Sequence, residues 1–190
     1  MGPRVLIKGM SGSGKSTLAA RLAACLGVPH VELDALHHGP NWQAASPAAF
    51  RAAVGAGLDD ARGWVVDGNY DSKLGLLVLE RAELVVWLDL SLGLTLFRLF
   101  WRTSRRWLKR EELWNGNRES LRTAFWGRDA LFAWAVRSHF RQQREWPKRF
   151  AGRPLVRLRT PQEVEAWLAA FCSASAQVPV SARSGDTTKP

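Results

Sequence analysis

Short apolar runs recur along this chain of 190 residues. Four of them have the length of strands, at 5–7, 64–66, 84–88 and 154–158, and a more polar fifth lies at 30–34. Runs of this kind, without polar alternation, are typical of strands that are buried on both faces of a parallel sheet. The clearest is Leu84-Val85-Val86-Trp87-Leu88.

The stretches between these runs have the spacing of helices. Leu18, Leu22 and Leu26 follow helical periodicity, and Gly27 ends their segment. Ser46-Pro47 provides an N-cap and a first helical residue. Helices are predicted to follow at 47–62, 72–82 and 91–109, twice within 118–145, and at 161–171. Alternation of strands and helices predicts an α/β fold whose parallel sheet is covered on both faces.

One domain, at 1–172, accounts for this pattern, as a monomer or a homodimer. Residues 173–190 are rich in Ser, Ala and Thr without aromatic residues, so we expect a disordered tail. No apolar run is long enough to cross a bilayer, and the first strand leaves no room for a signal peptide. We therefore expect no membrane partner. Cys25 and Cys172 lack metal-ligand spacing and indicate buried thiols in a reducing cytoplasm.

Positive charge is concentrated in one region of the chain. The net charge is +10, yet residues 98–159 alone hold 17 Lys/Arg against 5 Asp/Glu. Such a region could face a polyanion, a membrane surface or a small phosphorylated ligand, or it could be a solvated surface.

The segment Gly9-Met10-Ser11-Gly12-Ser13-Gly14-Lys15-Ser16 fits the phosphate-loop pattern G-x-x-x-x-G-K-[ST] at every fixed position. It lies between a predicted strand and a predicted helix, where backbone N–H groups and the helix N-terminus can hold an anion. Lys15 can reach the β- and γ-phosphates, and the Ser16 hydroxyl can bind Mg²⁺. The predicted cofactors are ATP and Mg²⁺, and the expected phosphate contacts are Gly9, Ser11, Gly12, Ser13, Gly14, Lys15, Ser16 and Thr17.

Three aspartates follow predicted strands, and the carboxyl ends of parallel strands share one edge of the sheet. Asp67 precedes a glycine and is the favoured carboxylate on the Mg²⁺ side, with Asp89 as its rival. Asp34 could orient an acceptor hydroxyl, or its carboxylate could simply be satisfied by backbone N–H groups.

A row of cations follows one face of the predicted helix at 91–109, namely Arg98, Arg102, Arg105 and Lys109, with Arg106 beside it. Guanidinium groups suit phosphate oxygens, so Arg98, Arg102 or Arg106 is expected to stabilise a transferring phosphoryl group. The alternative is a solvated basic face.

Several loop residues remain to be placed. His37 and His38 are adjacent, so their side chains diverge, and no third ligand is spaced to join them at a metal. A pocket or surface role is favoured for both. Trp42 could wall a pocket or belong to the core. A polar loop could close over the nucleotide; it contains Asn115, Asn117, Arg118 and Glu119.

Four segments together resemble the adenylate-kinase-like P-loop proteins of the FlaR-like group, also called topology modulation proteins. They are the phosphate loop, residues 33–42, Trp64-Val65-Val66-Asp67-Gly68-Asn69-Tyr70 and the strand that ends at Asp89. The resemblance covers about residues 4–171. It implies a three-layer fold with strand order 2-3-1-4-5, ATP with Mg²⁺, and a helical, arginine-bearing lid at about 98–150.

Two departures separate the chain from true adenylate kinases. The Thr-Gly-Asp-Met-Leu-Arg-type segment that grips AMP has no counterpart at 34–46, and Asp67-Gly68-Asn69-Tyr70-Asp71 lacks the arginine of Asp-Gly-Phe-Pro-Arg. Gluconate- and shikimate-type kinases offer another analogy, since their acceptor-side aspartate follows the second strand, as Asp34 does.

The favoured function is a kinase that transfers the γ-phosphate of ATP to an unidentified small acceptor. A nucleotide-gated nucleic-acid-binding protein is an alternative, because arginines and tryptophans share the basic region, but no nucleic-acid signature is present. The third hypothesis is an NTPase without an acceptor.

Overall fold

Five parallel strands form the centre of the computed structural model, which describes residues 2–109, 111–117 and 131–176. The strands are β1 (Arg4–Gly9), β2 (His30–Glu32), β3 (Trp64–Asp67), β4 (Leu84–Leu88) and β5 (Leu155–Leu158). Their order is β2-β3-β1-β4-β5, and every neighbouring pair is parallel. The predicted P-loop α/β fold is confirmed.

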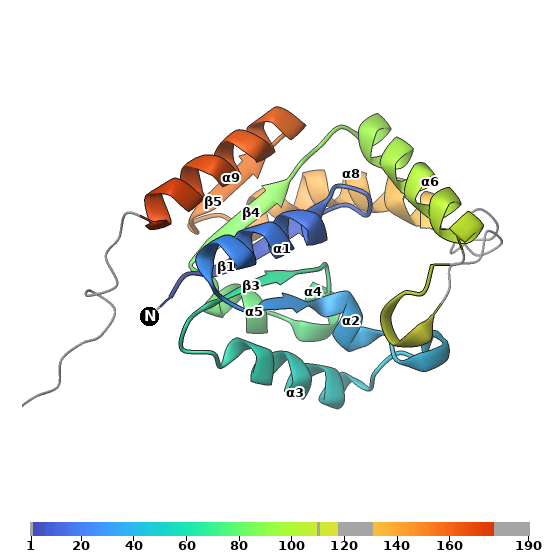
Figure 1. The fold of residues 1–190 in the computed structure, drawn as a ribbon, viewed down its shortest axis with the longest axis horizontal. Helices are drawn as coiled ribbons and strands as arrows, with labels where there is room; N and C mark the ends of the chain where they lie inside the picture. The colour runs from blue at the N-terminus through green and yellow to red at the C-terminus, as the bar shows by residue number, and fades with distance from the viewer. Residues whose placement is uncertain (1, 110, 118–130, 177–190) are drawn as a thin grey trace, which may run out of the picture.

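Helices connect the strands and cover both faces of the sheet (Figure 1). They are α1 (Lys15–Leu26), α2 (Leu33–His37), α3 (Pro47–Leu58), α4 (Asp71–Leu74), α5 (Leu77–Arg81), α6 (Leu92–Lys109), α8 (Leu131–Arg149) and α9 (Pro161–Ala176). Two short 3₁₀ turns, η1 (Pro40–Trp42) and η2 (Trp114–Gly116), lie in connections.

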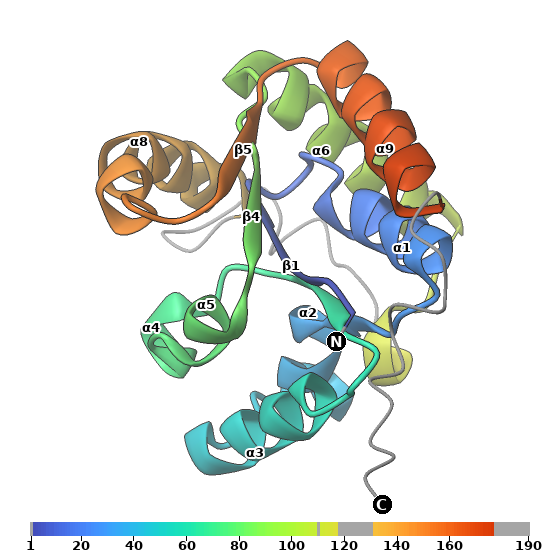
Figure 2. The ribbon, with the colours of Figure 1, turned by 90° about the vertical axis from the view of Figure 1, so that its left-hand side faces the viewer.

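Figure 2 shows the layers on either side of the sheet. Helices α1 and α9 cover one face, where Leu18, Leu22 and Leu168 pack on the strands. Helices α3, α4, α5 and α8 cover the other, where Phe50 and Trp146 belong to the second core. Strands β1 and β3 are parallel, with Ile7 opposite Asp67, the last residue of β3, so the loops that follow these strands lie at the same edge.

Most local predictions are confirmed, but the single helix expected at 72–82 is divided at Gly75 and Leu76 into α4 and α5. The strand at 84–88 has the predicted limits, and Ser46 Oγ accepts a hydrogen bond from Ala49 N, as expected of the N-cap of α3. The second strand is shorter than predicted: it ends at Glu32, and Asp34 lies in the first turn of α2. The expected tail begins as helix, because α9 continues to Ala176; residues 177–190 lie outside the described residues.

The prediction of two separate thiols is wrong. Cys25 of α1 and Cys172 of α9 form a disulfide, with their Cα atoms 6.0 Å apart. The two helices pack side by side on one face of the sheet, which brings together residues that are 147 positions apart in sequence. Because disulfides are rare in reducing compartments, the cysteines no longer support a cytoplasmic location.

Candidate functional site

The predicted phosphate loop connects β1 to α1. Gly12 and Gly14 have φ angles of 85° and 89°, a left-handed conformation that side-chain-bearing residues rarely adopt. Gly14 is the N-cap of α1, so the helix begins at Lys15 and directs its free N–H groups toward the loop. This is the geometry of an anion cradle.

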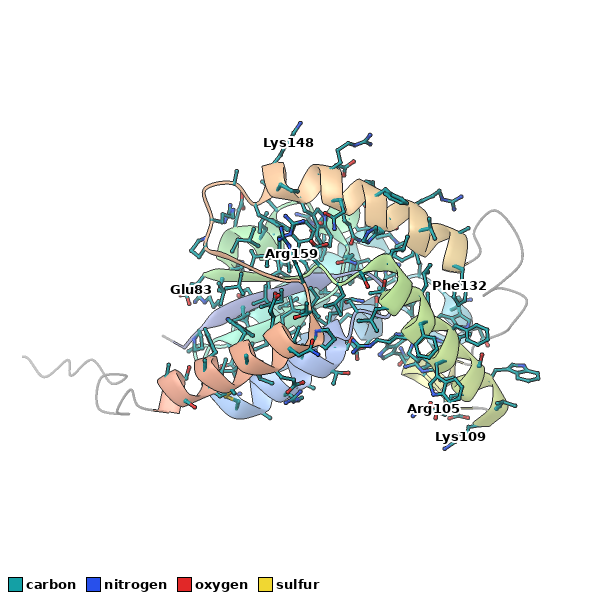
Figure 3. The ribbon with its side chains drawn as sticks, turned by 90° about the horizontal axis from the view of Figure 1, so that it is seen from above. Glu83, Arg105, Lys109, Phe132, Lys148 and Arg159 are labelled. Carbon is teal, nitrogen blue, oxygen red and sulfur yellow. A yellow bond between two sulfur atoms is a disulfide. The ribbon has the colours of Figure 1, made fainter. Side chains whose placement is uncertain are left out.

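Helix α6 packs directly on the loop. A Cβ added to Gly12 would lie 2.4 Å from the Thr95 carbonyl oxygen, so glycine is needed for the contact. Leu99 of α6 is fully buried with Met10, and Phe132, labelled in Figure 3 where α8 meets α6, packs on the same cluster. The first half of α6 is therefore fixed against the phosphate loop.

Ser16 and Asp67 meet at this edge of the sheet. Ser16 Oγ donates to Asp67 Oδ2 at 2.6 Å, and the other oxygen of the buried carboxylate lies 2.7 Å from His30 Nε2. A hydroxyl and a carboxylate are hard oxygen donors of the kind that Mg²⁺ prefers, so these residues fit the ion. His30 was not recognised from the sequence as part of the site.

Asp89, the rival carboxylate, has a different set of partners. Arg157 of β5 binds it through Nε at 2.8 Å and Nη2 at 2.6 Å, and Gln143 of α8 donates to its other oxygen. These contacts tie α8 and β5 to the end of β4. Of the two carboxylates, Asp67 is the one in contact with the phosphate loop.

Residues 67–71, from the last residue of β3 to the first of α4, contact β1 and α2. Asn69 Nδ2 donates to the Gly9 carbonyl at 2.7 Å, Tyr70 OH donates to Asp34 Oδ1 at 2.7 Å, and Asp71 accepts from Lys8 Nζ at 2.8 Å. Gly68 lies so close to α2 that an added Cβ would be 2.7 Å from the Leu33 Cβ. The sequence identified only Asp67 within this segment.

Lys8 is a buried cation directly before the phosphate loop. Its side chain is 2% exposed and pairs with Asp71, which is 22% exposed and also lies 3.8 Å from Arg149 Nε. Burial lowers the pKa of Lys8, and the Asp71 carboxylate opposes that shift. A lysine inside an otherwise apolar strand requires such a partner, and this was the signal available in the sequence.

Asp34 lies on the side of α2 and accepts its bond from Tyr70. Burial and the nearby carboxylate raise the pKa of Tyr70, which keeps the phenol protonated as the donor. His37 is buried beside Lys73, whose Nζ lies 2.6 Å from its Nε2, and burial is the main cause that lowers its pKa. Within the described ranges, neither His37 nor His38 belongs to a cluster of three side chains that could bind a metal ion.

The arginines of α6 lie at different distances from the loop. The Arg98 guanidinium reaches over Gly14, with Nη1 4.0 Å from the position that a Cβ there would occupy. Arg102 is partly buried, and Arg106 lies 4.0 Å from Glu111. Arg98 therefore lies beside the phosphate loop.

The polar loop that contains Asn115 and Asn117 docks on the η1 turn and the residues before it. Asn117 donates to the Gly39 carbonyl at 2.9 Å and accepts from Trp42 N at 2.7 Å, and Asn115 donates to the His38 carbonyl. These residues therefore hold the η1 turn, in which Trp42 is 42% exposed and not part of the core. Arg118 and Glu119 lie outside the described residues.

A cleft of about 660 Å³ opens between α4 and α8. Asn69 and Asp71 line one wall, next to the residues that they bind at the end of β1. The opposite wall carries more positive than negative charge, from Arg141, Arg144, Glu145, Lys148 and Arg149 of α8.

Comparison with solved structures finds several proteins that share this fold. Shikimate kinase from Bacteroides thetaiotaomicron is similar with a TM-score of 0.55 and 13% identity, covering 90% of this chain and 97% of that one. A sugar kinase from Janibacter sp. HTCC2649 has a TM-score of 0.53 and 17% identity, covering 93% and 98%. Deoxyadenosine kinase from M. mycoides has a TM-score of 0.50 and 10% identity, covering 93% and 100%.

At these identities the likeness concerns the fold alone. No protein-family model matches the chain, and no curated protein matches it significantly.

Proposed function

We propose that this chain is an ATP-dependent phosphotransferase that passes the γ-phosphoryl group to a small acceptor, within the adenylate-kinase-like, FlaR-like group that its motifs resemble. The observation that carries the proposal is the 2.6 Å hydrogen bond from Ser16 Oγ to Asp67 Oδ2 beside the phosphate loop. A loop hydroxyl next to a strand-end carboxylate is the arrangement that holds Mg²⁺ in P-loop phosphotransferases.

The donor half of the reaction is assigned to the loop and α6. Backbone N–H groups from Gly9 to Thr17 hold the phosphates, and Lys15 neutralises the β- and γ-phosphates. Ser16 and Asp67 hold Mg²⁺, which when bound offsets phosphate charge. Arg98 is the first choice to stabilise the transferring group, and Arg102 and Arg106 follow it.

The acceptor half is assigned to the cleft between α4 and α8. Its position beside Asn69, which is hydrogen-bonded to Gly9, supports direct transfer from the loop. The cationic α8 wall favours a small acceptor that carries negative charge as well as a hydroxyl. Asp71, on the cleft wall, can orient that hydroxyl, and Asp34, which contacts the same segment through Tyr70, is the candidate for an acceptor hydroxyl on the α2 side.

The test is phosphate transfer from radiolabelled ATP to a panel of sugar acids, nucleoside monophosphates and other hydroxyl compounds. Lys15→Ala should abolish turnover, whereas Asp34→Asn should abolish transfer and retain ATP binding. The control is Arg62→Gln, which changes an exposed pair with Asp60 and should keep full activity. Labelled free phosphate with no labelled acceptor would instead indicate an NTPase, and normal transfer by Asp34→Asn would remove its assigned role.

A further inference from the structure

Helix α6 exposes large apolar side chains on the side that faces away from the phosphate loop. Phe97 is 65% exposed, Trp101 is 66% exposed and Leu108 is 72% exposed. Their spacing of four and seven residues places them on one face of the helix, which we call the outer face of α6.

Within residues 2–109, 111–117 and 131–176, the fold holds α6 through its opposite side and not through the outer face. Thr95, Leu99 and Thr103, on the opposite side of the helix, are buried and hold α6 on the phosphate loop and α8. Side chains on the outer face are therefore not needed for packing in the described part of the chain. A concentration of exposed apolar residues of this size is typical of an interaction surface.

The charge of α6 restricts what can occupy this surface. The helix contains Arg98, Arg102, Arg105, Arg106 and Lys109 and no acidic residue. Arg105 and Lys109 are exposed at the outer end of the helix, as Figure 3 shows, on the flank of the outer face. Aromatic and aliphatic side chains bordered by cations are characteristic of helices that lie in a membrane interface rich in anionic lipid.

We propose that the outer face of α6 docks on the surface of a membrane that contains anionic lipids. Phe97, Trp101 and Leu108 enter the interface, and Arg105 and Lys109 contact lipid phosphates. The helix lies at one end of the long axis of the molecule, where a flat surface can reach it (Figures 1 and 3). The sequence predicted no membrane partner because no run could span a bilayer, but a surface contact requires no spanning segment.

Two other occupants fit the observations less well. A second copy of the chain, paired through the same face, would bring Arg105 and Lys109 of one α6 toward those of the other. A nucleic acid would satisfy the cations and could stack on Trp101, but Leu108, the most exposed of the three apolar side chains, offers no ring for a base. A bilayer accommodates both kinds of side chain.

The docking proposal is independent of the proposed phosphotransferase activity and is tested with the full chain. Co-sedimentation is measured with vesicles of phosphatidylglycerol and phosphatidylcholine, and with vesicles of phosphatidylcholine alone. Only the anionic vesicles should bind the protein at low salt. Phe97→Ser with Trp101→Ser should abolish binding, and Arg105→Gln with Lys109→Gln should weaken it roughly 25-fold.

The matched control is Phe140→Ser, which removes a 62% exposed phenylalanine from α8 and should leave binding unchanged. Thermal unfolding verifies that each variant is folded, and the charge variants remain informative if the apolar ones are not. Equal binding by wild type and folded outer-face variants would overturn the proposal. So would absence of vesicle binding together with outer-face-dependent dimerisation or single-stranded DNA binding.

Discussion

Asp71→Asn tests the most unusual electrostatic feature of the molecule, the buried Lys8 that precedes the phosphate loop. Lys8 Nζ lies 2.8 Å from Asp71 Oδ1, and the lysine side chain is 2% exposed. The substitution keeps the size of the side chain and removes its charge. The ammonium group of Lys8 would then be buried without a carboxylate partner.

The expected loss is large for a single polar substitution. Breaking a buried ion pair from one side costs about 3–5 kcal/mol, and the 22% exposure of Asp71 favours the lower end, about 3 kcal/mol. For a chain of this size, that corresponds to a fall in Tm of roughly 6–12 °C. Lys8→Met should cost about 1 kcal/mol or less, because Asp71 keeps water and Arg149 as neighbours. The double variant should recover most of the loss.

The pH dependence gives a second signature. Burial holds the folded-state pKa of Lys8 below its ordinary value of 10.5. Between these two pKa values the unfolded chain binds more protons than the folded chain, so stability rises with pH. Asp71→Asn removes the carboxylate that raises the pKa of Lys8. The folded-state pKa therefore falls further, and the pH range in which stability rises extends to lower pH. The difference in free energy of unfolding between the wild type and Asp71→Asn should therefore become smaller as the pH increases toward 10.5.

The assay is urea unfolding of the wild type, both single variants and the double variant, followed by circular dichroism at several pH values. Glu165→Gln is the control, since it breaks an exposed ion pair with Arg21 and should change the midpoint very little. An Asp71→Asn midpoint equal to that of the wild type would refute the reasoning. A double variant no more stable than Asp71→Asn would refute it as well.

Three further changes test other contacts. Gly12→Ala places a Cβ 2.4 Å from the Thr95 carbonyl oxygen at a φ of 85°, so the affinity for ATP in calorimetry should fall at least about tenfold. The control is Gly27→Ala, whose Cβ meets no atom within 4 Å and which should leave the ATP affinity unchanged. Cys25→Ser should lower stability by about 2–4 kcal/mol, and a reductant should bring the wild type to the same midpoint without affecting the variant. Burial lowers the pKa of His37 in the folded chain, so the unfolded chain binds the proton first and the free energy of unfolding should fall as the pH drops below 6.5. His37→Gln should reduce this pH dependence. NMR titration of the wild type should report the lowered pKa.

The parts of the fold that the sequence predicted depend on local patterns. The strand at 84–88 and the long helix that follows it are readable because apolar runs and helical spacing are local properties. The phosphate loop is readable because its glycines must adopt particular φ angles, which Gly12 and Gly14 do. Asp67 followed from its position at the end of an apolar strand.

Long-range contacts were not predictable in the same way. The disulfide joins positions 147 residues apart, and the bond from Asn117 to Gly39 spans 78 residues; both depend on which elements lie side by side. Asp34 was expected at the end of a strand, but the chain turns into α2 after Glu32. A three-residue strand followed by a five-residue helix carries too little periodicity for its boundary to be read.

The segment from Asp67 to Asp71 shows how local and long-range information combine at the site. Asp67 binds Ser16, Asn69 binds the Gly9 carbonyl, and Asp71 binds Lys8, so three of its side chains hold the phosphate loop or the strand before it. Tyr70 turns the other way and donates to Asp34. Asn69 and Asp71 also line the cleft. A shift of this segment on acceptor binding would therefore reach the phosphate loop directly, which couples the two halves of the proposed reaction through five consecutive residues.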